Sequence, residues 1–386
     1  MNLELNPQVL AWARQRAGLS AGLLAEKLKV ATDRVETWER TGQLRYRQAE
    51  RLAKVTRTPF GFLFLPAPPE EPLGIPDFRT VTDAPLAQPS PELIDTVQQM
   101  QRRQAWMRDY LVEEGAPALP FVGSTTLEDP PERIAAGMRE VLALGDGWAA
   151  LAPTWLEALR LFRQRLEAAG ILVFINGIVG NNTHRPLSVQ EFRGFALSDA
   201  YAPLIFINGA DAKAAQLFTL AHEAAHLWLG AGGVSNLVLL EPAPDPLERL
   251  CNAAAAELLV PAELLRSVWP QAQGSAEPYQ FLARHFKVSP IVAARRAQDL
   301  SLISRPELLQ FYQAYEADER RNKAREAGGG DFWNTQNVRL GGRFGAAVAR
   351  ATKEGRLLYR DAYRLTGLRG ATFEVRQGAR ARPGDA

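Results

Sequence analysis

The 386-residue sequence predicts an α+β protein that is mostly helical. Three observations support this fold class. Apolar residues recur at helical spacing over most of the chain, two short apolar runs, "ILVFIN" and "PLIFIN", have the composition of strands, and helical patterns flank both runs. We therefore expect a helical N-terminal bundle, a central domain with a small sheet, and a helical basic C-terminal tail.

Composition sets broad limits on the class of protein. The hydrophobic content of 46% and charged content of 23% are ordinary for a globular chain. The formal charge is only +2, but arginine is frequent near both ends, so any nucleic-acid contact should involve the ends. Cys251 is the single cysteine, which excludes an intramolecular disulfide and fits a reducing compartment. No signal-peptide pattern and no apolar run near roughly 18 residues is present, so we expect a cytoplasmic protein with no membrane contact.

The first part of the chain divides into a helical module and a connector. Residues 7–56 show short helical patterns that are broken at "AGLS", "KVAT" and "TGQL". The following segment, 58–80, is too rich in proline to continue a helix. We place a first domain at 1–66, and a Pro-rich linker and helical connector at 67–150 that includes a long helix over about 90–114.

The remaining chain predicts a central domain at 151–315 and a tail at 316–386. Between Pro153 and Val234 a helix, a strand, a polar loop, two further strands and a second helix follow one another. More helices continue to about Tyr315. The tail is basic and punctuated by glycine, but "GAAVARATKEGRLLYRDAYRLTG" keeps helical apolar spacing. We expect the tail to be structured and to serve partner or nucleic-acid docking.

The run "FTLAHEAAHLWLG" carries the clearest chemical signal. Residues four apart lie on the same helix face, so His222 and His226 direct their imidazoles to one point, where Zn²⁺ could bind. Glu223 is placed to accept a proton from metal-bound water. The alternative is a polar stripe or a pair of core histidines. With four histidines in the chain, HExxH arises by chance in roughly a few sequences per thousand, which favours a metal site.

Catalytic zinc usually takes a third protein ligand, and the next helix offers candidates. In "DPLERLCNAAAAELLVP", Glu248 and Glu257 are nine residues apart and so lie on opposite faces, which means that only one can reach the site. The alanines at 253–256 would allow close packing on the HExxH helix and favour Glu248. An exposed acid at the helix start is the alternative for Glu248, and Cys251 is a weaker candidate ligand because free cysteine is usually a small buried hydrophobe.

These runs, "FRGFALSD…PLIFIN…FTLAHEAAHLWLG…ERLCNAAAAELLVP", resemble the ImmA/IrrE family of metallo-endopeptidases, and "IPDFRT" and "HFKVSPIVAARR" resemble its branch with a leading helix-turn-helix. The resemblance covers the chain from Pro7 to about Leu302. It implies a zincin-like (gluzincin) minimal peptidase domain that cleaves or inactivates a partner transcriptional repressor. It also implies that His222, His226 and Glu248 bind zinc and that Glu223 is the catalytic acid/base, and it supports Glu248 over Glu257.

Three further polar residues have both a functional and a structural interpretation. Arg193 and Asn208 coincide with recurrent positions on the strands of the family, but an arginine in a buried pair and an asparagine capping the next helix are equally good explanations. His184, in the loop "GNNTHRP", could stabilise an oxyanion. An exposed loop histidine is the preferred interpretation.

The N-terminal module resembles an XRE-type helix-turn-helix. The positions that would form its small core carry these residues: Leu24, Ala25, Leu28, Val30, Val35 and Trp38. Five residues are candidates for DNA contact: Thr32, Arg34, Thr37, Arg45 and Arg47. Ala21 replaces the usual glutamine, however, and Asp33 and Glu36 would repel phosphate, so a protein-docking or dimerising role competes with DNA binding.

Two hypotheses of different class follow. The first is a zinc peptidase whose substrate is a regulatory protein, either a repressor or a toxin encoded by a neighbouring gene. The second is a DNA-binding regulator or an antitoxin-like protein of a toxin–antitoxin module, in which the metal site is structural or vestigial.

Overall fold

The computed structural model describes residues 2–71, 73–77, 89–235, 243–317, 339–368, Gly370 and Phe373. The chain forms two compact units. The first comprises Met1–Gly74 with Asp83–Gln98, and the second comprises Ile75–Thr82 with Gln99–Ala386.

The first unit is a helical module with a short ribbon. Four of its α-helices occupy the stretch in which the apolar spacing predicts short helices: α1 (Pro7–Arg16), α2 (Ala21–Leu28), α3 (Thr32–Thr41) and α4 (Tyr46–Thr56). Ser20 caps α2 by accepting a hydrogen bond from the Leu23 amide. Two strands that the sequence did not predict, β1 (Asn2–Glu4) and β2 (Gln43–Arg45), pair antiparallel. The core includes five of the six expected residues, and Val30 packs against it.

A four-stranded sheet organises the described part of the second unit, in the order β3-β5-β4-β6. Its strands are β3 (Leu172–Asn176), β4 (Gly194–Leu197), β5 (Leu204–Asn208) and β6 (Gly233–Ser235). β3 and β5 are parallel, whereas β4 runs antiparallel to both β5 and β6. The first three strands lie in the predicted runs. β6 was not predicted, because three residues directly after a helix carry too little pattern.

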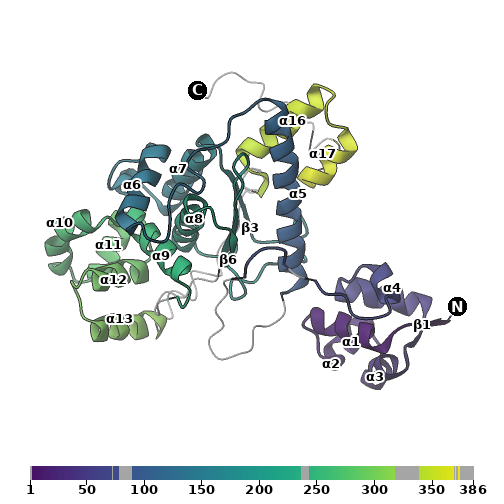
Figure 1. The fold of residues 1–386 in the computed structure, drawn as a ribbon. Coiled ribbons are helices and arrows are strands. Elements are labelled where there is room, and N and C mark those ends of the chain that lie inside the picture. Colours follow the sequence, from purple (N-terminus) through teal and green to yellow (C-terminus); the bar gives the residue numbers. More distant parts are fainter. Residues whose placement is uncertain are drawn as a thin grey trace. The chain divides into compact units, whose positions relative to one another are not determined.

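Helices cover both faces of this sheet (Figure 1). α7 (Trp155–Ala168) and α8 (Lys213–Trp228) lie on one face, where Val173 and Ile175 of β3 join the main core. The alternate residue Phe174 points to the other face and contacts Phe344 of α16 (Gly342–Lys353), with 5.6 Å between ring centroids. α16, from the basic tail, therefore completes the sheet's second layer, and its docking role stays a prediction.

α5 (Pro91–Glu113) belongs to this second layer from residue 99 onward. Trp106 of α5 packs edge-to-face on Phe344, and the buried Arg103 lies over Phe174 and donates a hydrogen bond to the Leu365 carbonyl at the end of α17 (Tyr359–Thr366). Contacts between segments far apart in the sequence thus hold α5, β3 and the tail helices α16 and α17 together.

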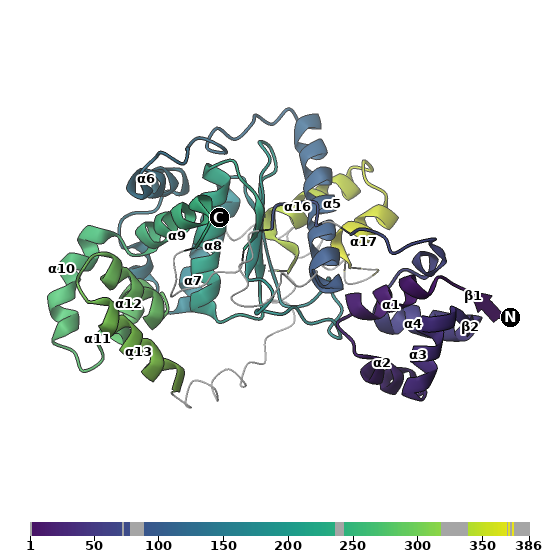
Figure 2. The ribbon, with the colours of Figure 1, turned by 60° about the horizontal axis from the view of Figure 1, so that its bottom comes forward.

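The remaining helices extend the layer that contains α8. α6 (Pro131–Leu142) and α9 (Pro246–Leu259) pack against α8, and α6 contributes Ile134 and Met138 to the core although it lies in the stretch expected to be a connector. Beyond α9 (Figure 2) come four more helices: α10 (Ala262–Gln273), α11 (Pro278–Phe286), α12 (Pro290–Asp299) and α13 (Arg305–Ala317). Within the described ranges, none of the helices has both the length and the apolar character needed to cross a bilayer.

Candidate metal centre

α8 is buried from Gln216 to its end, which fits the apolar residues on all its faces in this stretch. Every residue from Gln216 to Trp228 is buried, and the His222, Glu223 and His226 side chains have no exposed surface. Ionisable groups are costly in such a position unless they are paired or coordinate a metal. The partners of these three groups therefore determine what the helix can do.

α9 supplies the partner of the two histidines. Asp245 caps this helix by accepting hydrogen bonds from the Leu247 and Glu248 amides, and Pro246 occupies its first position. This local signal fixes the start of α9 and puts Glu248 in its first turn. Because α9 packs on α8, Glu248 faces the imidazoles and is itself buried.

The three side chains converge closely. The two Nε2 atoms of His222 and His226 are 3.1 Å apart, Glu248 Oε2 is 3.2 Å from His222 Nε2, and Glu248 Oε1 is 3.1 Å from His226 Nε2. Ligands at zinc–donor distances of ~2.0–2.1 Å in a tetrahedron lie about 3.3 Å from one another. The donor set and its spacing therefore fit a Zn²⁺ ion with three protein ligands.

The electrostatics of the cluster favour an ionised carboxylate. Burial alone would raise the pKa of Glu248, but hydrogen bonds with His222 and His226 lower it to about 2. Burial tends to lower the pKa of His222, but the hydrogen bond and the charge of Glu248 outweigh burial and raise it. Burial dominates for His226, whose pKa is lowered. An anionic Glu248 between two imidazoles is a typical environment for a divalent cation.

Glu223 lies beside this cluster and is held from the sheet side. Ser235 Oγ, at the end of β6, donates a hydrogen bond of 2.5 Å to Glu223 Oε1. Burial raises the pKa of Glu223 to about 8, although the charge of His222 and the bond from Ser235 oppose that shift. Burial thus moves the pKa of Glu223 towards the neutral range that suits a general acid/base.

Gly194 leaves space for this carboxylate. A Cβ atom at position 194 would lie 2.8 Å from Thr219 Cγ2, 3.0 Å from the Phe206 carbonyl oxygen and 3.1 Å from Glu223 Oε1. Sequence reasoning named neither Gly194 nor Ser235. The only signals were a glycine inside the strand pattern "FRGFALSD" and a serine after the HExxH helix, and neither is specific.

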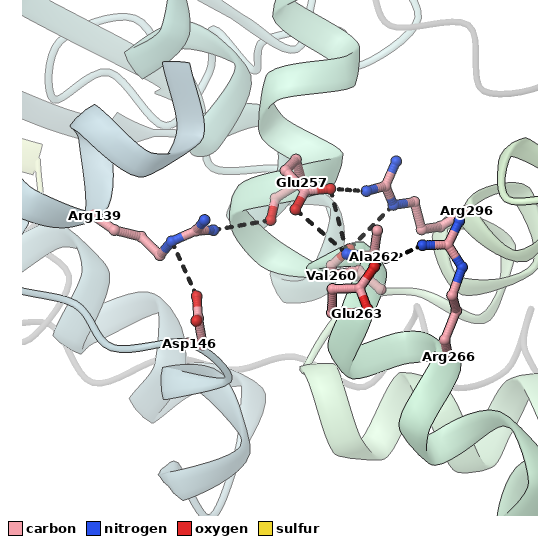
Figure 3. Close-up of polar contacts among 8 residues, drawn as sticks. All are labelled: Arg139, Asp146, Glu257, Val260, Ala262, Glu263, Arg266 and Arg296. Carbon is pink, nitrogen blue, oxygen red and sulfur yellow. Dashed lines mark hydrogen bonds and ion pairs between the residues drawn. The ribbon is translucent and has the colours of Figure 1, made fainter. Parts of the chain in front are cut away.

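Glu257, the other candidate on α9, lies in a different environment (Figure 3). Its carboxylate is buried and paired with Arg296 of α12, and it accepts weak hydrogen bonds of 3.3 and 3.4 Å from the Ala262 amide at the start of α10. Arg139 of α6 donates to the Glu257 carbonyl at 3.2 Å. Glu257 thus links four helices, and it is not among the converging donors.

The other polar candidates have structural partners. Cys251 is buried in the core, its pKa raised well above the usual value by burial, and it lies outside the donor cluster found among the described residues. Arg193 forms an ion pair of 2.6 Å with Asp211. The Asn208 side chain donates a hydrogen bond to the Phe192 carbonyl and accepts one from the Ala210 amide, and His184 is exposed in its loop.

The five DNA-contact candidates are dispersed over the first unit. Thr32 and Arg34 are exposed on α3, and Arg45 and Arg47 are exposed where β2 meets α4. Thr37 is half-buried, and its hydroxyl donates to the Asp33 carbonyl at 2.7 Å. Asp33 and Glu36 are exposed on the same helix. DNA binding by this module stays a prediction.

Two family models match the chain. Residues 166–298 match the IrrE N-terminal-like domain, Peptidase M78, which supports the resemblance to ImmA/IrrE metallopeptidases over about a third of the chain. This segment contains the HExxH helix, the sheet and α9. Residues 340–375 match a domain of unknown function (DUF8813). No curated protein and no solved structure matches the chain.

Proposed function

We propose that the protein is a zinc-dependent endopeptidase that cleaves or inactivates a partner transcriptional regulator. One observation carries the proposal: His222, His226 and Glu248 converge at 3.1–3.2 Å inside the segment that resembles Peptidase M78. A structural zinc site would need a fourth protein ligand. Among the described residues the cluster offers three, which is the number typical of a catalytic site.

The different environments of the site residues suggest different roles. His222, His226 and Glu248 would hold the ion, and when bound it supplies a Lewis acid that polarises a scissile carbonyl and activates water. Glu223 would take the proton of the attacking water and pass it to the leaving amine. Burial moves its pKa towards neutral pH, which suits donation to the leaving amine, and a bound cation would lower it towards the ionised form that accepts the proton of water.

The substrate is inferred from the resemblance to ImmA/IrrE proteins. We take it to be a repressor or toxin encoded next to this chain. The first unit would then serve as a docking module for this partner or for its DNA.

The experiment compares Glu223→Gln with the wild-type full chain. Zinc content of the purified proteins and cleavage of the neighbouring regulator are measured in parallel. An amide fills the same space but does not accept the proton, so zinc should stay stoichiometric while cleavage falls on the order of 10²–10⁴-fold. Glu263→Gln, at an exposed glutamate of α10, is the matched control and should leave both unchanged.

Two outcomes would contradict the proposal. Full cleavage by Glu223→Gln would remove the peptidase mechanism. Stoichiometric zinc without any cleavage by the wild type would instead favour a regulator with a structural metal site.

A further inference from the structure

The two oxygens of the Glu223 carboxylate have different surroundings. Oε1 accepts the hydrogen bond from Ser235 at 2.5 Å, and both side chains are fully buried. Oε2 is also buried, and within the described ranges it has no hydrogen-bond partner. A buried carboxylate oxygen without a partner is costly, so this asymmetry calls for a reason other than stability.

The strand that carries Ser235 is held by backbone hydrogen bonds on both of its edges. Its position on β6 pairs with Gly194 of β4, and its carbonyl accepts a hydrogen bond of 3.2 Å from the Arg193 amide. On the opposite edge of β6, the Val234 amide donates to the Pro76 carbonyl at 2.9 Å. The hydroxyl therefore comes from a strand fixed by backbone hydrogen bonds, which are more precise supports for a site than a loop.

We propose that Ser235 is a positioning residue: its hydroxyl holds Oε1 of Glu223 so that Oε2 is the oxygen that exchanges a proton with the attacking water. A free carboxylate rotates about its last side-chain bond and presents either oxygen. Holding one of them leaves the other in a single orientation, which lowers the entropic part of the barrier. Gly194 contributes by leaving space on the same side of the carboxylate. The inference deepens the proposed function and rests on it.

A purely structural role for Ser235 makes a different prediction. In that case the hydroxyl only ties the end of β6 to α8, and its loss affects stability alone. Thr352 in α16 provides the matched control, since its hydroxyl is also buried and donates one hydrogen bond, of 2.7 Å, to the Val348 carbonyl.

The kinetic test compares Ser235→Ala, Ser235→Thr and Thr352→Ala in the zinc-loaded full chain. Removing the hydrogen-bond partner of a metal ligand typically costs about 10- to 100-fold in activity, and we take the same range for the partner of the catalytic base. We expect kcat of Ser235→Ala to fall by that factor with KM and zinc content unchanged, because Ser235 contacts the base and not the substrate. Ser235→Thr, which keeps the hydroxyl, should restore most of kcat. An unchanged kcat in Ser235→Ala would overturn the proposal.

A second measurement is independent of any substrate. Co²⁺ replaces zinc, and its visible absorption bands report the surroundings of the metal. Ser235→Ala should shift the bands in the same direction as Glu223→Gln. The double variant Ser235→Ala/Glu223→Gln should have the same bands as Glu223→Gln alone. Thr352→Ala should leave the wild-type bands unchanged. If the wild type cleaves no regulator, the proposed function is wrong, but the absorption bands still test whether Ser235 orients the Glu223 carboxylate. Identical bands in Ser235→Ala and wild type would overturn it.

Discussion

The two glutamates of α9 are buried to nearly the same extent, with 5% of Glu248 and 6% of Glu257 exposed, yet their surroundings are opposite in kind. Glu248 faces two imidazoles, which are neutral ligands that can share a metal ion with it. Glu257 faces the permanent cation of Arg296 and the N-terminus of α10 (Figure 3). Burial alone therefore does not identify a site residue, because the partner decides whether a carboxylate can bind a ligand or only joins helices.

The largest effect should come from breaking the Glu257 pair. Glu257→Ala leaves the buried guanidinium of Arg296 without its carboxylate, and removing one member of a buried pair costs about 3–5 kcal/mol. Urea unfolding in the presence of a chelator measures the loss. A double variant, Glu257→Leu with Arg296→Met, should recover much of it, and a single variant as stable as wild type would contradict the pairing.

The next effect should appear in zinc affinity. Structural zinc sites bind with ~10–16 kcal/mol over four ligands, or about 2.5–4 kcal/mol per ligand, so Glu248→Ala should weaken binding by roughly 10²–10³-fold. Glu257→Gln should leave affinity near the wild-type value, because its side chain lies on the opposite face of α9. Competition with a chromophoric chelator measures both. Zinc lost from Glu257→Gln but kept by Glu248→Ala would reverse the ligand assignment.

The smallest effect is the change in the free energy of unfolding with pH that the third buried glutamate, Glu223, should cause. Burial raises the pKa of Glu223 from 4.5 to about 8, so the folded, metal-free chain binds a proton that the unfolded chain has already released. Stability should then fall as pH rises between about 4.5 and 8, at most ~1.4 kcal/mol per pH unit. Glu223→Gln has no such proton, so its stability relative to wild type should increase between pH 6 and pH 7. A constant difference would contradict the raised pKa.

Glu248 should show the opposite dependence. Its pKa is lowered to about 2 by the two histidines, so its contribution to stability is present above about 4.5 and is lost as pH falls towards 2. Comparing the acid unfolding of Glu248→Gln with that of the wild type measures this effect, which falls in a lower pH range than the effect of Glu223.

Much of the fold and part of the site followed from local pattern. The helices of the first unit, the three longer strands and the HExxH helix lie where apolar spacing predicts them. His222 and His226 converge because residues four apart lie on the same face of a helix. Glu248 and Glu257 point in opposite directions because residues nine apart lie on opposite faces. These predictions needed no knowledge of neighbouring segments.

Contacts between distant segments decided the rest. Packing of α9 on α8 selects Glu248 for the histidines and gives Glu257 to Arg296, 39 residues later in the chain. The pairing of β6 with β4 brings Ser235 to Glu223, and the tail helix α16 covers Phe174 on the far face of the sheet. The helical period determines which residues share a face. The free energy of burial across the whole unit determines which other element packs against that face. For this reason the sequence by itself determined the converging histidine pair and favoured Glu248 of the two candidate glutamates, and only the tertiary structure brought Glu248 to the histidines and gave Glu257 its arginine partner.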